Sequence, residues 1–154
     1  MEIYRVAFFG HREVENHIYI EEKLLPIIEH LIKEHEYVEF LVGNDGEFDV
    51  LVASSVRKAK KLYRNDNSML IWVMPYLKSQ YLKNRIEYEN YYDEIEICEK
   101  SSHTFYKDAF RIRNRKMIER SDLIIFYVEK DLGGAYESLK YAIKQNRSYI
   151  NLAK

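Results

Sequence analysis

The stretch YKDAFRIRNRKMIERSDLIIFYVEKDLGGAYESLKY, residues 106–141, decides the fold of this 154-residue chain. It predicts a helix, a buried strand over Asp122–Val128, a turn at Gly133 and Gly134, and a second helix. The strand is a bounded apolar run rich in isoleucine and aromatic residues, which is typical of a central strand covered on both faces. Beyond the glycines, apolar residues recur at helical spacing, namely Ala135, Leu139, Ala142 and Ile143.

The paired glycines indicate a phosphate site. A strand that leads through glycines into a helix N-terminus exposes backbone N–H groups, and the helix dipole favours an anion there. A glycine pair after a strand is also common in a plain turn. The preceding helix holds three arginines, and we expect one or two of them to point to the same cleft, because alternate helical residues cannot all face one way. These are Arg111, Arg113 and Arg115.

Five more strands are predicted, at residues 3–8, 38–42, 69–74, 92–98 and 148–152, the fourth of these from the alternation of Ile95 and Ile97 with glutamates. Helical periodicity is found at residues 16–35 and 49–63. Strands that alternate with helices at this spacing imply right-handed crossovers and a parallel sheet. We therefore predict a single α/β domain over residues 1–154, with a Rossmann-like three-layer fold, a mainly parallel sheet of about six strands, and helices on both faces.

All five glycines of the chain lie just beyond predicted strands. Gly10 is followed by His11 and Arg12, and the run Gly43-Asn44-Asp45-Gly46 leads through Asp49 into a helix. Ligands of open α/β sheets bind at the carboxyl edge of the strands, so these loops are expected to line one site with Gly133 and Gly134. Structural alternatives remain for each loop: a histidine cap, a surface ion pair, a turn built on Asn and Asp, or a plain N-cap.

Composition excludes several classes of protein. The formal net charge of -1 and the pI near 6.5 give no overall attraction to nucleic acid or to anionic membranes. The single cysteine, Cys98, excludes an internal disulfide framework and a cysteine-based zinc site. With no leader pattern and no apolar run of membrane-spanning length, we expect a cytoplasmic protein with no membrane partner, no bound metal and no cofactor.

The tyrosine-rich segment Tyr76–Tyr92 is expected to be partly helical or to form a flap over the site. The chain has 14 tyrosines, and their use in packing or self-association is favoured over stacking on a base. We accordingly expect a homo-oligomer.

The residues at the strand ends, taken in order, resemble the SLOG superfamily, and within it the DUF1273/YpsA-like branch of small stand-alone bacterial Rossmann-like proteins. The matching pieces are Gly10-His11-Arg12, Val42–Asp49, Arg113–Met117, Ser121-Asp122 and Gly133-Gly134. This superfamily is associated with nucleotides and nucleotide-derived ligands. Its LOG branch hydrolyses the N-glycosidic bond of nucleoside 5'-monophosphates, and its DprA branch binds single-stranded DNA.

The resemblance implies roles for individual residues. Arg113 stands in the place of the LOG-type catalytic arginine, and Gly133 and Gly134 match the phosphate-binding glycines. The LOG signature P-G-G-x-G-T-x-x-E is incomplete, because Leu132 replaces its proline, the third glycine is missing, and Glu137 is out of phase with the catalytic glutamate. Glu137 and Arg113 are the candidate catalytic residues.

These observations predict a protein that binds a nucleotide-derived small molecule as a sensor or regulator. The candidate ligand-binding residues are Gly10, His11, Arg12, Gly43, Asn44, Asp45, Gly46, Asp49, Arg113, Asn114, Arg115, Gly133 and Gly134. The alternative is an enzyme that cleaves an N-glycosidic bond, for which Glu137, Asp45 or Asp49 would supply the carboxylate. Single-stranded DNA binding is a further alternative, which the near-neutral net charge does not favour. A self-assembling scaffold without a ligand also remains.

Overall fold

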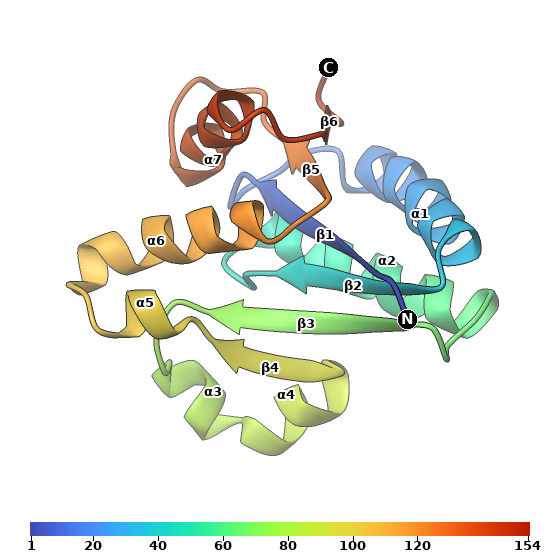
Figure 1. Cartoon of the computed structure of the whole chain (residues 1–154), viewed down its shortest axis with the longest axis horizontal. Helices are drawn as coiled ribbons and strands as arrows, with labels where there is room; N and C mark the ends of the chain where they lie inside the picture. Colours follow the sequence, from blue (N-terminus) through green and yellow to red (C-terminus); the bar gives the residue numbers. More distant parts are fainter.

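The computed structural model describes residues 1–154 and contains one six-stranded sheet in which every strand pair is parallel (Figure 1). The strands are β1 Ile3–Gly10, β2 Tyr37–Val42, β3 Ser68–Met74, β4 Glu94–Ile97, β5 Leu123–Tyr127 and β6 Tyr149–Asn151. All six were predicted, and they differ from the prediction only at their ends. The Rossmann-like α/β fold is therefore confirmed.

Seven helices connect the strands. They are α1 His17–Glu34, α2 Glu47–Leu62, α3 Ser79–Lys83, α4 Arg85–Tyr91, α5 Glu99–Ser102, α6 Tyr106–Glu119 and α7 Gly134–Lys144. The short helices α3, α4 and α5 showed no helical periodicity in the sequence, and α5 was not predicted in any form. No helix is both long enough and apolar enough to cross a bilayer.

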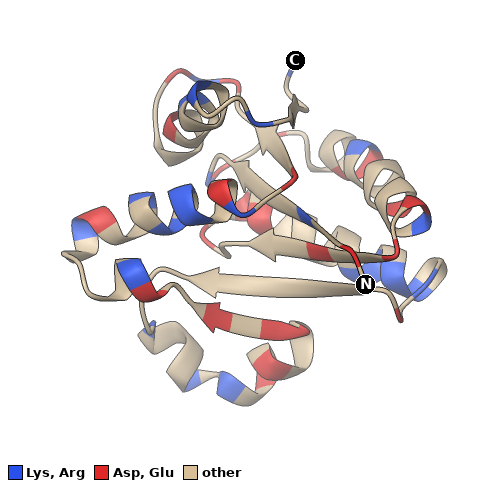
Figure 2. Cartoon of the chain, viewed as in Figure 1, with Lys and Arg blue, Asp and Glu red and all other residues tan.

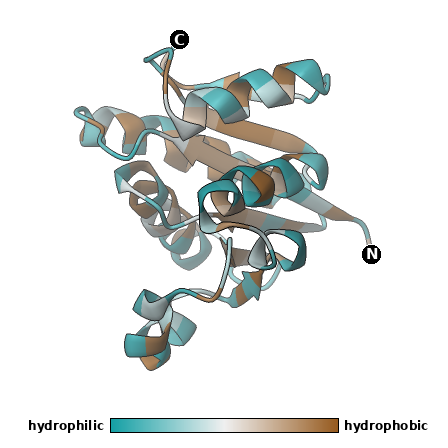
Figure 3. Cartoon of the chain, turned by 90° about the vertical axis from the view of Figure 1, so that its left-hand side faces the viewer, coloured by the Kyte–Doolittle hydropathy of each residue, from teal (hydrophilic) through white to brown (hydrophobic).

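The core has two layers because successive strand residues point to opposite faces of the sheet. On β1, Val6 and Phe8 belong to a cluster of 24 buried residues that α1 and α2 complete. Ala7 and Phe9 belong to a cluster of 12 on the other face, under α6 and α7. The strands are mostly brown between helices with teal outer faces in Figure 3. Both faces of the sheet are thus covered, as predicted.

The tyrosine-rich segment folds as α3 and α4 and packs on the larger core cluster. The ring of Trp72 lies 4.9 Å from that of Tyr88, 5.4 Å from that of Tyr92 and 6.0 Å from that of Tyr81, measured between centroids. These three tyrosines therefore serve packing, which was the favoured interpretation.

The strand order β4-β3-β2-β1-β5-β6 places a switch in chain direction at β1. The chain moves from β1 outward through β2, β3 and β4, then returns to pair β5 with the other side of β1, where Gly10 lies opposite Tyr127. The loops that follow β1 and β5 run in opposite directions from the carboxyl ends of these strands. They leave a crevice at the carboxyl edge of the sheet, where the strand arrows of Figure 1 end.

Candidate ligand-binding cleft

A cleft of about 390 Å³ lies at this edge, between the ends of β1, β2 and β5 and the start of α7. Eleven of the thirteen predicted ligand-binding residues line it. They are Gly10, His11, Arg12, Gly43, Asp45, Gly46, Asp49, Arg113, Asn114, Gly133 and Gly134. The strand-end loops, which are far apart in sequence, therefore meet in one place.

Three predicted residues lie outside this cleft. Asn44 faces a neighbouring groove. Arg115 stacks its guanidinium 4.7 Å from the ring centre of Tyr141, on the side of α6 that meets α7. Glu137 is a largely exposed residue of α7 that pairs with Lys140 at 3.5 Å. The cleft as it stands does not contain the carboxylate that the LOG resemblance implied.

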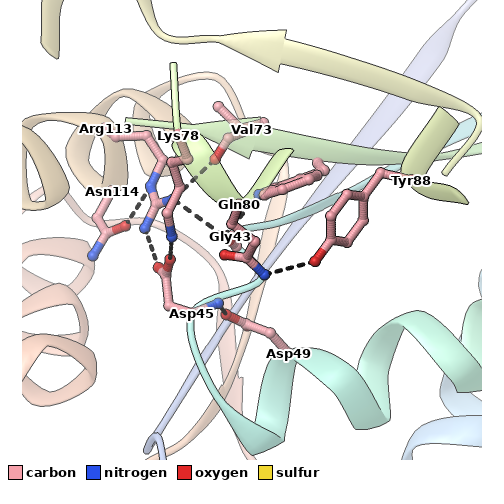
Figure 4. Close-up of polar contacts among 10 residues, drawn as sticks. Gly43, Asp45, Asp49, Val73, Lys78, Gln80, Tyr88, Arg113 and Asn114 are labelled. Atoms are coloured by element: carbon pink, nitrogen blue, oxygen red, sulfur yellow. Dashed lines mark hydrogen bonds and ion pairs between the residues drawn. The ribbon is translucent and has the colours of Figure 1, made fainter. Parts of the chain in front are cut away.

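Of the three arginines on α6, a helix with several basic turns in Figure 2, only Arg113 lines the cleft, and it is 1% exposed. Its Nη1 donates to the carbonyl oxygens of Val73 at 2.9 Å and Gly43 at 3.4 Å. Its Nη2 pairs with the Asp45 carboxylate, and its Nε donates to Asn114 Oδ1 at 3.0 Å (Figure 4). Arg113 thus ties α6 to the ends of β2 and β3, and most of its donors are already satisfied.

Three of the glycines are needed for close packing, and one of them is Gly46, where a Cβ would lie 2.5 Å from Arg12 Cα. A Cβ on Gly43 would lie 2.8 Å from Asp45 Oδ2 and 3.0 Å from Arg113 Nη2, so the missing side chain makes room for that ion pair. A Cβ on Gly10 would overlap the ring of Phe48, which is fully buried. The sequence shows that these glycines follow strands, but it does not show which side chains lie next to them in the fold. These packing roles were therefore not predicted.

The two glycines at the start of α7, Gly133 and Gly134, are not crowded by neighbouring atoms. Gly133 has a φ of 95°, which favours glycine, and a Cβ on Gly133 or Gly134 would meet nothing within 4 Å. No side chain caps α7, and the first of its amides with a partner is that of Glu137, which donates to Gly133 O at 3.1 Å. The amides of Gly134 and Ala135 therefore remain free where these residues line the cleft.

Two cations of the cleft are also free. Arg12, from the loop after β1, and Lys130, from the loop after β5, line the cleft and form no ion pair. Lys130 was not predicted, although its place between a strand end and a glycine pair was visible in the sequence. Together with the free amides, these side chains favour an anion.

His11 forms hydrogen bonds to the loop between β5 and α7. Its Nε2 accepts the amides of Glu129 at 3.0 Å and Lys130 at 3.1 Å, so the ring proton lies on Nδ1. Burial lowers the pKa of His11, the charge of Lys130 lowers it further, and the charge of Glu129 opposes them. His11 therefore acts as a neutral acceptor that joins the ends of β1 and β5.

Asp49 is a buried carboxyl group of the cleft, 8% exposed. Its Oδ2 accepts the amide of Asp45 at 2.9 Å, one turn before it. Burial raises the pKa of Asp49 to about 7, and the nearby charge of Asp45 adds to the shift, while that amide and the cations Arg113 and Arg12 oppose it. Burial therefore favours the neutral form of this carboxyl group.

Asp45 itself lies between two cations. Besides its pair with Arg113, its Oδ1 is 3.8 Å from the ammonium group of Lys78 and has no hydrogen bond. The carboxylate thus joins the loop after β2 to α6 and to the segment after β3.

No protein-family model matches the chain, and no curated protein matches it in sequence. Solved structures do. DNA processing protein A from Helicobacter pylori, described for its single-stranded DNA binding mode, superposes with a TM-score of 0.65 at 18% identity, over 95% of this chain and 63% of that one. DprA from Streptococcus pneumoniae superposes with a TM-score of 0.67 at 13% identity, over 96% of this chain and 49% of that one.

The chain therefore spans about half to two thirds of the length of these DprA proteins. At such low identity the likeness shows the fold alone. That fold is a Rossmann-like α/β fold.

Proposed function

We propose that this chain binds a nucleotide or nucleotide-derived ligand by its phosphate and acts as a sensor or regulator. The observation that supports this most directly is the free N-terminus of α7, which opens into a cleft beside two cations without ion pairs, Arg12 and Lys130. Backbone amides at a helix N-terminus, a favourable dipole and nearby cations are the features that bind phosphate in α/β proteins. We further propose that the chain is one SLOG-type domain of the DUF1273/YpsA-like branch, which the DprA-like fold supports.

Two placements count against Glu137 and Arg113 as the catalytic pair of a glycosidic hydrolase. Hydrolysis needs a carboxylate close to the sugar and a cation free to hold the phosphate. Glu137 lies outside the cleft. Most of the N–H groups of Arg113 already donate to other groups of the protein, in Val73, Gly43, Asp45 and Asn114.

Thermal melting across a panel of ligands tests the proposal. The panel contains nucleoside mono-, di- and triphosphates, ADP-ribose and dinucleotides, each with wild type and with Arg12→Ala. A ligand at about 100 times its dissociation constant adds roughly 2.7 kcal/mol, which is a shift of several degrees for a chain of this length. We expect one ligand class to shift the wild type and to shift Arg12→Ala much less.

Arg64→Ala is the matched control, because Arg64 is an exposed arginine that follows α2 at its far end and pairs with Asp66. This variant should respond as the wild type does. A panel without any shift would contradict the proposal, and so would an equal shift in Arg12→Ala.

Single-stranded DNA is the second candidate, and the likeness to DprA proteins favours it. Fluorescence anisotropy with a labelled thymidine oligonucleotide at several salt concentrations would test it. DNA binding releases counterions, so affinity should fall steeply as salt rises. Weak binding with no salt dependence would count against this candidate.

A further inference from the structure

A second, wider groove of about 790 Å³ adjoins the cleft. The two hollows have five lining residues in common, Arg12, Glu13, Asp45, Gly46 and Phe110. A ligand with its phosphate at the start of α7 can therefore extend past the loop after β2 into this groove.

An aromatic cluster forms one wall of the groove. The ring of Tyr76 meets that of Phe110 edge to face at 5.9 Å and that of Tyr106 at 6.5 Å. Tyr106 is 68% exposed, so most of its ring is available for contact. An aromatic ring beside a site for phosphate suits a flat, aromatic ligand group, because every base has a face that can stack.

Two amide side chains on the same groove have unused hydrogen-bonding capacity. Asn44, held at a φ of 54°, makes no side-chain hydrogen bond. Gln80 donates from Nε2 to Tyr88 Oη at 2.8 Å, which leaves its Oε1 free (Figure 4). An amide offers both a donor and an acceptor, as the edges of bases require.

We propose that this groove is the base subsite of the cleft: the purine or pyrimidine of a bound nucleotide stacks on Tyr106 and meets the amides of Asn44 and Gln80 with its edges. The inference rests on the proposed function, since it places the phosphate at the start of α7. It adds that the ligand retains its base, and that a sugar phosphate alone leaves this groove empty.

Calorimetric titration with two probes, adenosine 5'-monophosphate and ribose 5-phosphate, tests the subsite. We expect the wild type to bind the nucleotide at least about fivefold more tightly than the sugar phosphate, as one base stack contributes. Tyr106→Ala should remove that preference and leave the affinity for ribose 5-phosphate unchanged. Tyr106→Phe, which keeps the ring, should retain the preference.

Tyr63→Ala serves as the control, because Tyr63 is a partly exposed tyrosine at the opposite end of α2 from the groove. Equal affinity of the wild type for the two probes, or a preference that survives both Tyr106→Ala and Asn44→Ala, would overturn the base subsite and leave the phosphate site standing. If neither probe binds the wild type, the proposed function fails together with this inference.

Discussion

Replacing Arg113 with methionine is expected to lower the free energy of unfolding by roughly 3–5 kcal/mol, because it breaks a buried ion pair from one side. The Asp45 carboxylate would lose its closest cation, and the carbonyl groups of Gly43 and Val73 would lose a donor. Urea unfolding followed by the fluorescence of Trp72 measures the change. The indole of Trp72 donates to Gly43 O at 3.0 Å, so it reports on the same loop.

Two comparisons separate this effect from a general loss of charge. Arg111→Met removes an exposed arginine of the same helix, which pairs with Asp108, and should cost less than about 1 kcal/mol. Adding Asp45→Asn to Arg113→Met should recover part of the loss, because the unpaired carboxylate is then gone. If Arg113→Met lowered the free energy of unfolding no more than Arg111→Met does, Arg113 would not stabilise the cleft. That result would instead favour a role of Arg113 in ligand binding or catalysis.

Asp49 is expected to make the fold less stable as pH rises toward neutral. Its pKa is 3.8 when unperturbed and about 7 in the fold, so the folded state binds the proton more tightly. The stabilising contribution of the protonated carboxyl is complete below pH 3.8, and it is lost as pH rises through about 7. At about 1.4 kcal/mol per pKa unit, the loss is on the order of a few kcal/mol.

Asp49→Asn removes this proton but keeps an oxygen that can accept the Asp45 amide. Urea unfolding between pH 4.5 and 8 should show that the variant gains stability relative to the wild type as pH rises. The difference between the two curves isolates Asp49 from His11, whose lowered pKa acts in the opposite direction. Asp131→Asn, at an exposed position, should parallel the wild type. A difference that stays constant with pH would show that Asp49 is ionised throughout.

The fold was predictable because its signals are local. Buried parallel strands are continuous apolar runs, as in Asp122–Val128, and long helices such as α1 repeat apolar residues at a fixed spacing. A helix of four residues, such as α5, is too short for that spacing to appear. Thus the sheet and its long helices followed from the sequence, and the short connecting helices did not.

The cleft was predictable for a different reason. The carboxyl ends of parallel strands meet at one edge, so residues after β1, β2 and β5 had to approach one another. Which face of α6 meets the sheet depends on packing, so helical spacing alone could not separate Arg113 from Arg115, and only the resemblance to the LOG branch singled out Arg113. The use of Gly10 to accommodate Phe48 and the raised pKa of Asp49 also depend on burial, which is created by tertiary structure.

Nuclear magnetic resonance of the backbone amides tests the central claim most directly. The nucleotide that stabilises the protein most would be titrated into the labelled chain, with the amide signals of Gly134 and Ala135 assigned. These two signals should shift in a saturable way, because phosphate accepts hydrogen bonds from their N–H groups, and Arg12→Ala should weaken the binding. Saturable binding that moves signals elsewhere and leaves Gly134 and Ala135 unchanged would contradict a phosphate site at the start of α7.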